Sequence, residues 1–287
     1  MKLMKPAPFA YHAPNTLQDA LSLLAALAPE DGRILAGGQT LVPAMAFRMA
    51  RPAHLIDING IRELEGVSIA SDRLRIGACT RHAFFESGEI PGRLGDLLRK
   101  VVRFIAHYPI RQRGTFCGSI ANADPSSEWC CTTAALDGII VAESARGARR
   151  IAAKDFYKAL MTTALRDDEL ITAVELPVLS DDTRTGFSEF SRRAGDFAIA
   201  MALVTYRLER GLIADAHVGL GGAEAVPRRI PEAEEILNGQ APEPELFAAA
   251  GTAAAAAIEP IDDNNNPIEY RRALVRTLVG RALASAA

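Results

Sequence analysis

Residues 36–43 read Ala36-Gly37-Gly38-Gln39-Thr40-Leu41-Val42-Pro43 and directly follow a short apolar stretch at 33–35. A glycine pair between a buried strand and a helical turn lets the backbone approach a bulky anion, because glycine lacks a Cβ and adopts positive φ without strain. N–H groups at the start of the following helix can then bind phosphate oxygens. Taken alone, the residues fit an ordinary tight turn better, so a phosphate site is predicted here only if other motifs accompany them.

A second glycine-bearing segment, Gly114-Thr115-Phe116-Cys117-Gly118-Ser119, leads into Ala123-Asp124-Pro125 and Glu128. It offers hydroxyl groups beside small residues, and two carboxylates that can accept hydrogen bonds from a sugar or ribityl chain. An Asx-turn at Asn122 and a helix cap at Asp124 or Ser126 is the structural alternative. Neither segment matches the Rossmann or Walker A pattern. For the third glycine cluster, residues 219–222, a bulge or turn is expected.

Composition argues for an ordinary globular chain with few special partners. Of its 287 residues 49% are hydrophobic and 23% charged, and the net charge of −3 lacks the excess of basic residues expected for nucleic-acid binding. We expect no membrane span and no secretory signal, since no apolar run is long enough and the first residues are not apolar. The four cysteines do not form a metal-binding pattern; they predict free thiols in a reducing cytoplasm.

Hydrophobic periodicity predicts an α+β protein in which a sheet is followed by a run of helices. A helix capped by Asn15 or Thr16, with Gln18 or Asp19 completing a capping box, should open the chain. A boundary near residue 178 divides residues 1–177 from a C-terminal domain, 178–287, built on a three-stranded antiparallel sheet with helices. The expected strands are 33–35, 54–58, a hairpin over 67–78, 134–142, 170–176, 186–193, 200–209 and 212–220. The expected helices are 94–107, 154–161, 231–237, 243–257 and 266–284, with one helical turn at 41–45.

Taken together, the motifs resemble a known family. The stretches 36–43, Leu-Ile-Asp-Ile at 55–58, Gly-Ala-Cys-Thr-Arg-His at 77–82, 115–125 and Arg-Arg-Ala-Gly-Asp-Phe-Ala at 192–198 occur in the order and spacing found in the FAD-binding medium subunit of molybdenum hydroxylases. That family includes the carbon monoxide dehydrogenase, xanthine dehydrogenase and quinoline 2-oxidoreductase types. The resemblance spans nearly the whole chain. It implies a FAD-binding domain with two α/β subdomains, roughly 1–58 and 59–177, of the kind found in vanillyl-alcohol oxidase.

The resemblance also implies roles for individual residues. The two glycine-bearing segments would hold the FAD pyrophosphate, Asp124 and Glu128 would contact the ribityl and ribose portion, and Phe197 would shield the flavin. No catalytic or metal-binding residue is implied. The cofactor-binding residues implied are Leu35, Ala36, Gly37, Gly38, Gln39, Thr40, Leu41, Ala78, Thr80, His82, Gly114, Thr115, Cys117, Gly118, Ser119, Ala123, Asp124, Glu128, Leu170, Ile171 and Phe197.

Three of these positions have a competing interpretation. Cys117 stands where the family usually has glycine, and a cysteine forced to positive φ would cost on the order of 1 kcal/mol or more. Alternatively, the position tolerates a Cβ and only Gly118 is required. Phe197 fits plain core packing as well as a flavin contact, and His82 fits a solvated turn.

The resemblance implies a subunit that relays electrons and does not itself hydroxylate substrate. A large molybdopterin subunit and a small subunit with two [2Fe-2S] clusters would be its partners in an (αβγ)2 assembly. FAD in this chain would pass electrons to a small-molecule or protein acceptor. Two alternatives are a stand-alone FAD-dependent oxidoreductase and an assembly or scaffold subunit that has lost FAD, which Cys117 alone favours.

Overall fold

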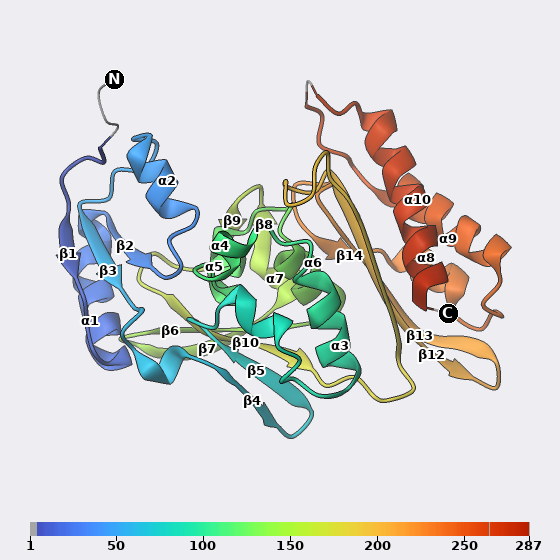
Figure 1. Ribbon diagram of the computed structural model, residues 1–287, viewed down its shortest axis with the longest axis horizontal. Coiled ribbons are helices and arrows are strands. Elements are labelled where there is room, and N and C mark those ends of the chain that lie inside the picture. Colours follow the sequence, from blue (N-terminus) through green and yellow to red (C-terminus); the bar gives the residue numbers. More distant parts are fainter. Residues whose placement is uncertain (1–4, 264, 287) are drawn as a thin grey trace.

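The computed structural model describes residues 5–263 and 265–286. These residues form four sheets, and the three larger ones lie side by side along the long axis of the molecule with helices packed beside them (Figure 1). The N-terminal sheet is drawn in blue, the central sheet in cyan to yellow-green, and the C-terminal sheet lies beside the orange and red helices. The mixture of helices and strands confirms the predicted α+β class.

The N-terminal sheet is parallel, with the order β1-β3-β2. Its strands are β1 (Ala10–His12), β2 (Gly32–Leu35) and β3 (His54–Asp57). Helix α1 (Leu17–Leu27) continues into the 3-10 turn η1 (Ala28–Glu30), and α2 (Leu41–Ala46) follows β2. Thr16 caps α1, since its side chain accepts a hydrogen bond from the backbone N–H of Asp19 at 3.1 Å, as the capping-box pattern predicts. Strand β1 was not predicted, because three residues are too few to show alternation.

The central sheet is antiparallel, with the order β4-β5-β10-β6-β7. Its strands are β4 (Val67–Ala70), β5 (Arg73–Gly77), β6 (Ile139–Ser144), β7 (Gly147–Ala152) and β10 (Leu170–Pro177). The helical segments around it are η2 (Arg62–Leu64), η3 (His82–Glu86), α3 (Gly92–Val101), α4 (Tyr108–Arg111), α5 (Phe116–Asn122), α6 (Glu128–Ala135) and α7 (Ala153–Phe156). A two-stranded ribbon is formed by β8 (Tyr157–Ala159) and β9 (Thr162–Thr163).

Three predicted elements of this region are wrong in part. The strand expected at 134–142 begins only at Ile139, because α6 runs to Ala135 and the chain turns through Asp137 at φ 50°. The helix expected at 94–107 ends at Val101, before a non-helical stretch that includes Ala106 at φ 44°. The helix expected at 154–161 is the single turn α7, after which the chain enters β8. In the first and third cases an apolar run did not distinguish a helix from a strand, and in the second it did not show where the helix ends.

The C-terminal sheet is antiparallel and has four strands, in the order β11-β12-β13-β14. The strands are β11 (Arg184–Phe190), β12 (Ala200–Glu209), β13 (Leu212–Gly221) and β14 (Arg228–Arg229), and the helices are α8 (Pro231–Leu237), α9 (Pro244–Ala257) and α10 (Ile268–Ala286). The predicted three-stranded sheet is therefore wrong by one strand. Two residues, both arginines, carry no alternation signal, and β14 forms only because its backbone pairs with Gly219 and Leu220.

Two apolar cores meet at β12. Successive side chains of a strand point to opposite faces, and accordingly Met201 and Leu203 join the core of the N-terminal and central sheets. Ala202 and Val204 instead join a core formed with α8, α9 and α10. The sheet of the C-terminal region is thus buried on both faces along β12. Across residues 5–263 and 265–286, no helix combines the length and apolar character needed to cross a membrane.

Candidate functional site

The first glycine segment, residues 36–40, connects the end of β2 to α2. Gly38 has φ 69°, a left-handed conformation that favours glycine. The Gln39 side-chain amide donates to the Gly37 carbonyl at 2.8 Å, and the N–H of Val42 donates to the Gly38 carbonyl at 3.0 Å. These bonds fix the conformation of the turn at the start of α2. Residues 35–39 and Leu41 are half-buried, and Thr40 is exposed.

The second glycine segment, residues 114–119, lies directly against the first. A Cβ added at Gly37 would lie 2.4 Å from the Arg113 carbonyl oxygen and 2.7 Å from Gly114 Cα. A Cβ added at Gly114 would lie 2.5 Å from His82 Nε2. Real Cβ atoms do not approach backbone this closely, so no side chain fits at Gly37 without a shift of backbone. The structure thus brings together the two segments that the sequence motifs single out.

Much of the second segment is the first turn of a helix. Thr115 caps α5, since its Oγ1 accepts a hydrogen bond from the Gly118 N–H at 3.1 Å. The backbone of Cys117 is helical, and its thiol donates to the carbonyl oxygens of Ile76 and Gly77 at 3.6 and 3.7 Å. Burial raises the pKa of this thiol well above its usual range. The hypothesis that Cys117 is strained at positive φ is therefore wrong, and the position tolerates a Cβ that points into the central sheet.

His82, the first residue of η3, packs against the second glycine segment. His82 is 4% exposed, which excludes the solvated-turn interpretation. Its backbone N–H donates to the Gly114 carbonyl at 2.9 Å, and Trp129 Nε1 donates to His82 Nδ1 at 2.9 Å. Burial, with the nearby charges of Arg111 and Arg81, lowers the His82 pKa to about 4. The ring is therefore neutral at physiological pH, with Nδ1 the acceptor and the proton on Nε2.

Ala78 and Thr80 are also buried, and their contacts are internal. The N–H of Ala78 donates to the Thr172 carbonyl at 3.0 Å, which ties the segment to β10. The Thr80 hydroxyl donates to the Gly66 carbonyl at 2.7 Å, and the N–H of Phe116 donates to the Thr80 carbonyl at 3.0 Å. Both residues thus fix the backbone that carries the site. Direct contact of their side chains with a cofactor stays a prediction.

Arg81 and Asn59 are two polar side chains at this site to which the sequence motifs assign no role. Arg81 Nη2 donates to Asn59 Oδ1 at 2.7 Å, and Arg81 Nη1 donates to the Arg113 carbonyl. Asn59 Nδ2 donates in turn to the Ala36 carbonyl at 2.8 Å. The motifs predict no role for either side chain. No local pattern signals a bond that depends on three distant segments.

Carboxyl groups follow α5, in the connection to α6. Asp124 is half-buried, and its Oδ1 accepts a hydrogen bond from the Ser126 N–H at 2.9 Å, so the Asx-type bond is made by Asp124 and the helix cap of α6 by Ser127. Glu128 is 8% exposed, and burial, with the charge of Asp124, raises its pKa to about 7. Burial and the charge of Glu128 raise the pKa of Glu189 in β11 to about 9. This pair is therefore substantially protonated near neutral pH.

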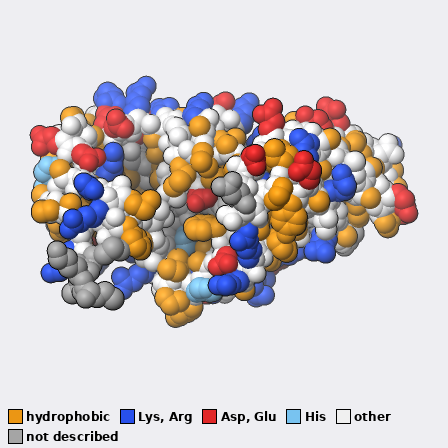
Figure 2. Space-filling model, turned by 90° about the horizontal axis from the view of Figure 1, so that it is seen from above, with side chains coloured by type: hydrophobic (Ala, Val, Ile, Leu, Met, Phe, Trp, Pro, Cys, Tyr) orange, Lys and Arg blue, Asp and Glu red, His pale blue; other side chains and the backbone are white. Residues whose placement is uncertain are grey.

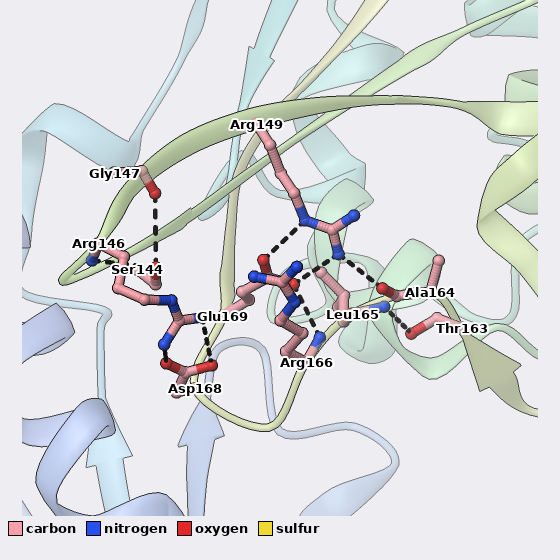
Figure 3. A network of polar contacts seen from close by, with 10 residues as sticks. All are labelled: Ser144, Arg146, Gly147, Arg149, Thr163, Ala164, Leu165, Arg166, Asp168 and Glu169. Atoms are coloured by element: carbon pink, nitrogen blue, oxygen red, sulfur yellow. Dashed lines mark hydrogen bonds and ion pairs between the residues drawn. The ribbon is translucent and has the colours of Figure 1, made fainter.

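Leu170 and Ile171 open β10 and are buried in the core. The loop just before them is held to the β6–β7 hairpin by two ion pairs (Figure 3). Arg149 binds both oxygens of Glu169 at 2.7 Å and the Ala164 carbonyl at 2.6 Å. Arg146 pairs with Asp168, with Nη2 to Oδ1 at 3.0 Å. These contacts hold the loop next to the start of β10, and the pairing of β10 with β6 is irregular directly after Ile171.

Phe197 lies in the connection between β11 and β12 and is 73% exposed, which excludes plain core packing. The end of this connection is anchored by Arg271 in α10, whose Nη1 donates to the carbonyl oxygens of Ile199 and Gly222 at 2.8 and 2.7 Å. The N–H of Gly222 donates to the Pro125 carbonyl at 2.7 Å. The first three residues of the third glycine cluster thus end β13, and only Gly222 forms the expected turn, which joins the C-terminal sheet to the segment that carries Asp124.

The face seen from above in Figure 1 is hollowed in its middle, and hydrophobic side chains surround the hollow (Figure 2). The residues that the sequence motifs single out fit a bound dinucleotide. Glycines that leave no room for a Cβ, backbone N–H groups and the small hydroxyl residues Thr40, Thr115 and Ser119 suit a pyrophosphate. Within the described ranges, no group of histidine, cysteine and carboxylate side chains is arranged to hold a metal ion.

Comparison with known proteins agrees with this geometry. Residues 7–179 match the family model of the FAD binding domain in molybdopterin dehydrogenase, and residues 185–286 match the carbon monoxide dehydrogenase flavoprotein C-terminal domain. The chain belongs to this family of flavoprotein subunits of molybdenum-containing dehydrogenases. It is therefore an oxidoreductase subunit with a FAD-binding domain.

Individual relatives cover almost the whole chain. The nicotine 6-hydroxylase medium subunit of Paenarthrobacter nicotinovorans is 36% identical, with 99% of each chain covered. A carbon monoxide dehydrogenase structure from Hydrogenophaga pseudoflava has a TM-score of 0.94 at 33% identity, covering 99% of this chain and 98% of the other. Quinoline 2-oxidoreductase from Pseudomonas putida 86 gives 0.91 at 32% identity, with the same coverage of 99% and 98%.

Proposed function

We propose that this chain holds FAD with the pyrophosphate between residues 36–40 and residues 114–119. The observation that carries the proposal is the contact of Gly37 with Arg113 and Gly114, which leaves two stretches of backbone side by side without intervening side chains. Thr40 and Ser119 supply hydroxyl groups at the same place. In this proposal the half-buried Asp124 accepts hydrogen bonds from the ribityl and ribose hydroxyls, and the exposed Phe197 covers the flavin.

When bound, FAD supplies one- and two-electron redox chemistry, which belongs to the cofactor. The protein binds and orients it. Neutral His82 and the Thr115 cap hold the second glycine segment, while Arg149 and Glu169 fix the loop before Leu170 and Ile171, the apolar side chains proposed to lie near the flavin ring. Burial keeps Glu189 protonated near neutral pH and leaves Glu128, close to Asp124, partly protonated.

The proposal includes partners. A small subunit with two [2Fe-2S] clusters delivers electrons to this chain, a large subunit with the molybdopterin cofactor oxidises the substrate, and an external small-molecule or protein acceptor takes the electrons away. Support comes from family membership and from the relative whose name is nicotine 6-hydroxylase medium subunit. The names of the relatives given above specify three different substrates: nicotine, carbon monoxide and quinoline. Similarity to them therefore does not identify the substrate of the complex, and we propose none. We place the (αβγ)2 complex in the cytoplasm, supported by four cysteines that form no disulfide.

We also propose a domain division near residue 178, with the FAD-binding part, 1–177, itself divided near residue 58. The separation of the three sheets supports this division. The scaffold alternative loses its one argument, because Cys117 lies in a helix and faces away from the first glycine segment toward β5.

The decisive experiment is to purify the chain, remove any bound flavin, and titrate the apoprotein with FAD. We expect a yellow protein that binds FAD with one-to-one stoichiometry, and reduction of that FAD by substrate only when both partner subunits are present. A folded chain that takes up no FAD would overturn the proposal. Reduction of the isolated chain by substrate would instead indicate a stand-alone oxidoreductase.

A further inference from the structure

A polar link joins the two glycine segments from the side of the central sheet. Arg81 donates from Nη1 to the carbonyl of Arg113, the residue just before Gly114, and from Nη2 to Asn59 Oδ1 at 2.7 Å. Asn59 Nδ2 donates to the carbonyl of Ala36, the residue just before Gly37, at 2.8 Å. The link, which we call the Arg81–Asn59 link, therefore ends on the residue preceding each glycine that is in contact.

The orientation of the Asn59 amide is fixed independently. Its Nδ2 also donates to Asp57 Oδ1 at 2.6 Å, and that same carboxylate oxygen accepts the Asn59 backbone N–H at 2.8 Å. A carboxylate only accepts, so the amide nitrogen must face Asp57 and Ala36. The amide oxygen is left facing Arg81. Asn59 therefore connects the Ala36 carbonyl of the first segment to the guanidinium of Arg81, which in turn binds the carbonyl of Arg113 beside the second segment.

We propose that Arg81, through Asn59, is a positioning residue that sets the separation of the two glycine segments for the FAD pyrophosphate; this rests on the proposed function. The contact at Gly37 and Gly114 prevents the segments from coming closer, and the Arg81–Asn59 link prevents them from moving apart. Together the two constraints hold the backbone N–H groups in place before FAD arrives, so that binding does not have to order them.

This geometry requires the shape of an arginine side chain and not only its positive charge. A planar guanidinium presents several N–H donors in a fixed arrangement and can serve the Asn59 and Arg113 oxygens at once. A lysine ammonium keeps the charge near an anionic ligand but is a single point on a flexible chain. The proposal therefore predicts that lysine fails to replace Arg81, whereas a purely electrostatic role predicts that it succeeds.

The test compares Arg81→Lys, Arg81→Met, Asn59→Ala and the double variant Arg81→Met/Asn59→Ala with the wild-type chain. Arg62→Met, an exposed arginine in η2, is the matched control. Apoprotein is titrated with FAD and, separately, with riboflavin, which lacks the pyrophosphate. We expect each single variant to lose roughly 10- to 100-fold in FAD affinity, the double variant to lose little more than either, and the control to be unchanged. Riboflavin affinity should stay near the wild-type value in all of them.

Three results would overturn the proposal. They are wild-type FAD affinity in Arg81→Met, full rescue by Arg81→Lys, and equal losses for FAD and riboflavin, which would indicate general damage to the fold. If Arg81→Met does not fold, Arg81→Lys and Asn59→Ala carry the same comparison. A wild-type chain that binds no FAD would overturn the proposed function itself, whereas a wild type that binds FAD no better than its variants would overturn only the Arg81–Asn59 link.

Discussion

Replacing Gly37 by alanine tests whether the two glycine segments must touch for FAD to bind. The new Cβ would lie 2.4 Å from the Arg113 carbonyl oxygen, and an ordinary contact of these atoms is about 3.4 Å, so the segments must separate by about 1 Å. Both atoms that meet the Cβ most closely belong to backbone, so no side-chain rotation relieves the contact. Gly37 does not have the positive φ of Gly38, so the effect is one of space and not of backbone strain.

Overpacking of this kind costs about 1–3 kcal/mol. The first glycine segment is half-buried and lies outside the sheet, so the free protein can relax by moving it outward, with loss of the hydrogen bond from Asn59 to the Ala36 carbonyl. That movement spoils the pyrophosphate site, and the cost then falls on binding. We expect FAD affinity to fall about 5- to 150-fold, with little change in the melting temperature of the apoprotein.

The assay is titration of apoprotein with FAD, monitored by quenching of flavin fluorescence, with thermal unfolding measured in parallel. Gly60→Ala is the matched control, because a Cβ at Gly60 would meet no atom within 4 Å and its φ is not positive. Wild-type affinity in Gly37→Ala would refute the reasoning, since it would show that the contact between the segments does not matter for the cofactor. A loss of affinity in Gly60→Ala as large as in Gly37→Ala would show that the measurement does not report the contact.

The remaining predictions concern the carboxyl pair, Cys117 and Phe197. Burial raises the Glu128 pKa to about 7 and the Glu189 pKa to about 9, so the folded state holds protons that the unfolded state releases near pH 4.5. The stability that this pair contributes should be fully present below that pH and be lost as pH rises through 7 and beyond, by on the order of 3 kcal/mol for Glu128 alone. Urea unfolding of Glu128→Gln should show a shallower pH dependence than the wild type, and an unchanged slope would contradict the prediction. Cys117→Gly restores the residue that is usual in the family. Because the position is helical and buried, this change should lower the free energy of unfolding by about 1–3 kcal/mol without improving FAD affinity. Tighter FAD binding by this variant would contradict the prediction. Phe197→Ala should change the free energy of unfolding by less than about 0.5 kcal/mol, because the side chain is 73% exposed. The same variant should make the fluorescence of bound flavin easier to quench with iodide. Unchanged quenching would show that Phe197 does not cover the flavin.

The sequence by itself determined much of this protein. The capping box at Thr16, the hairpin of β4 and β5 and the strand that leads into the first glycine segment follow from local chemistry, and the structure contains them. The glycine motifs, in their order and spacing, also identified the family. These features can be recognised in the sequence because each depends on residues that are only a few positions apart.

The tertiary structure alone decided the rest. It placed Gly37 against Gly114, buried His82 under the second segment, turned Cys117 into the central sheet, and joined Arg81 to Asn59. It also added β14, whose two residues form a strand only because β13 offers a free edge. Periodicity reports which face of an element is apolar, but not which distant backbone will pack against it. The separation of the two glycine segments, on which the proposed cofactor site depends, is therefore a property of packing between sheets and cannot be read from either motif alone.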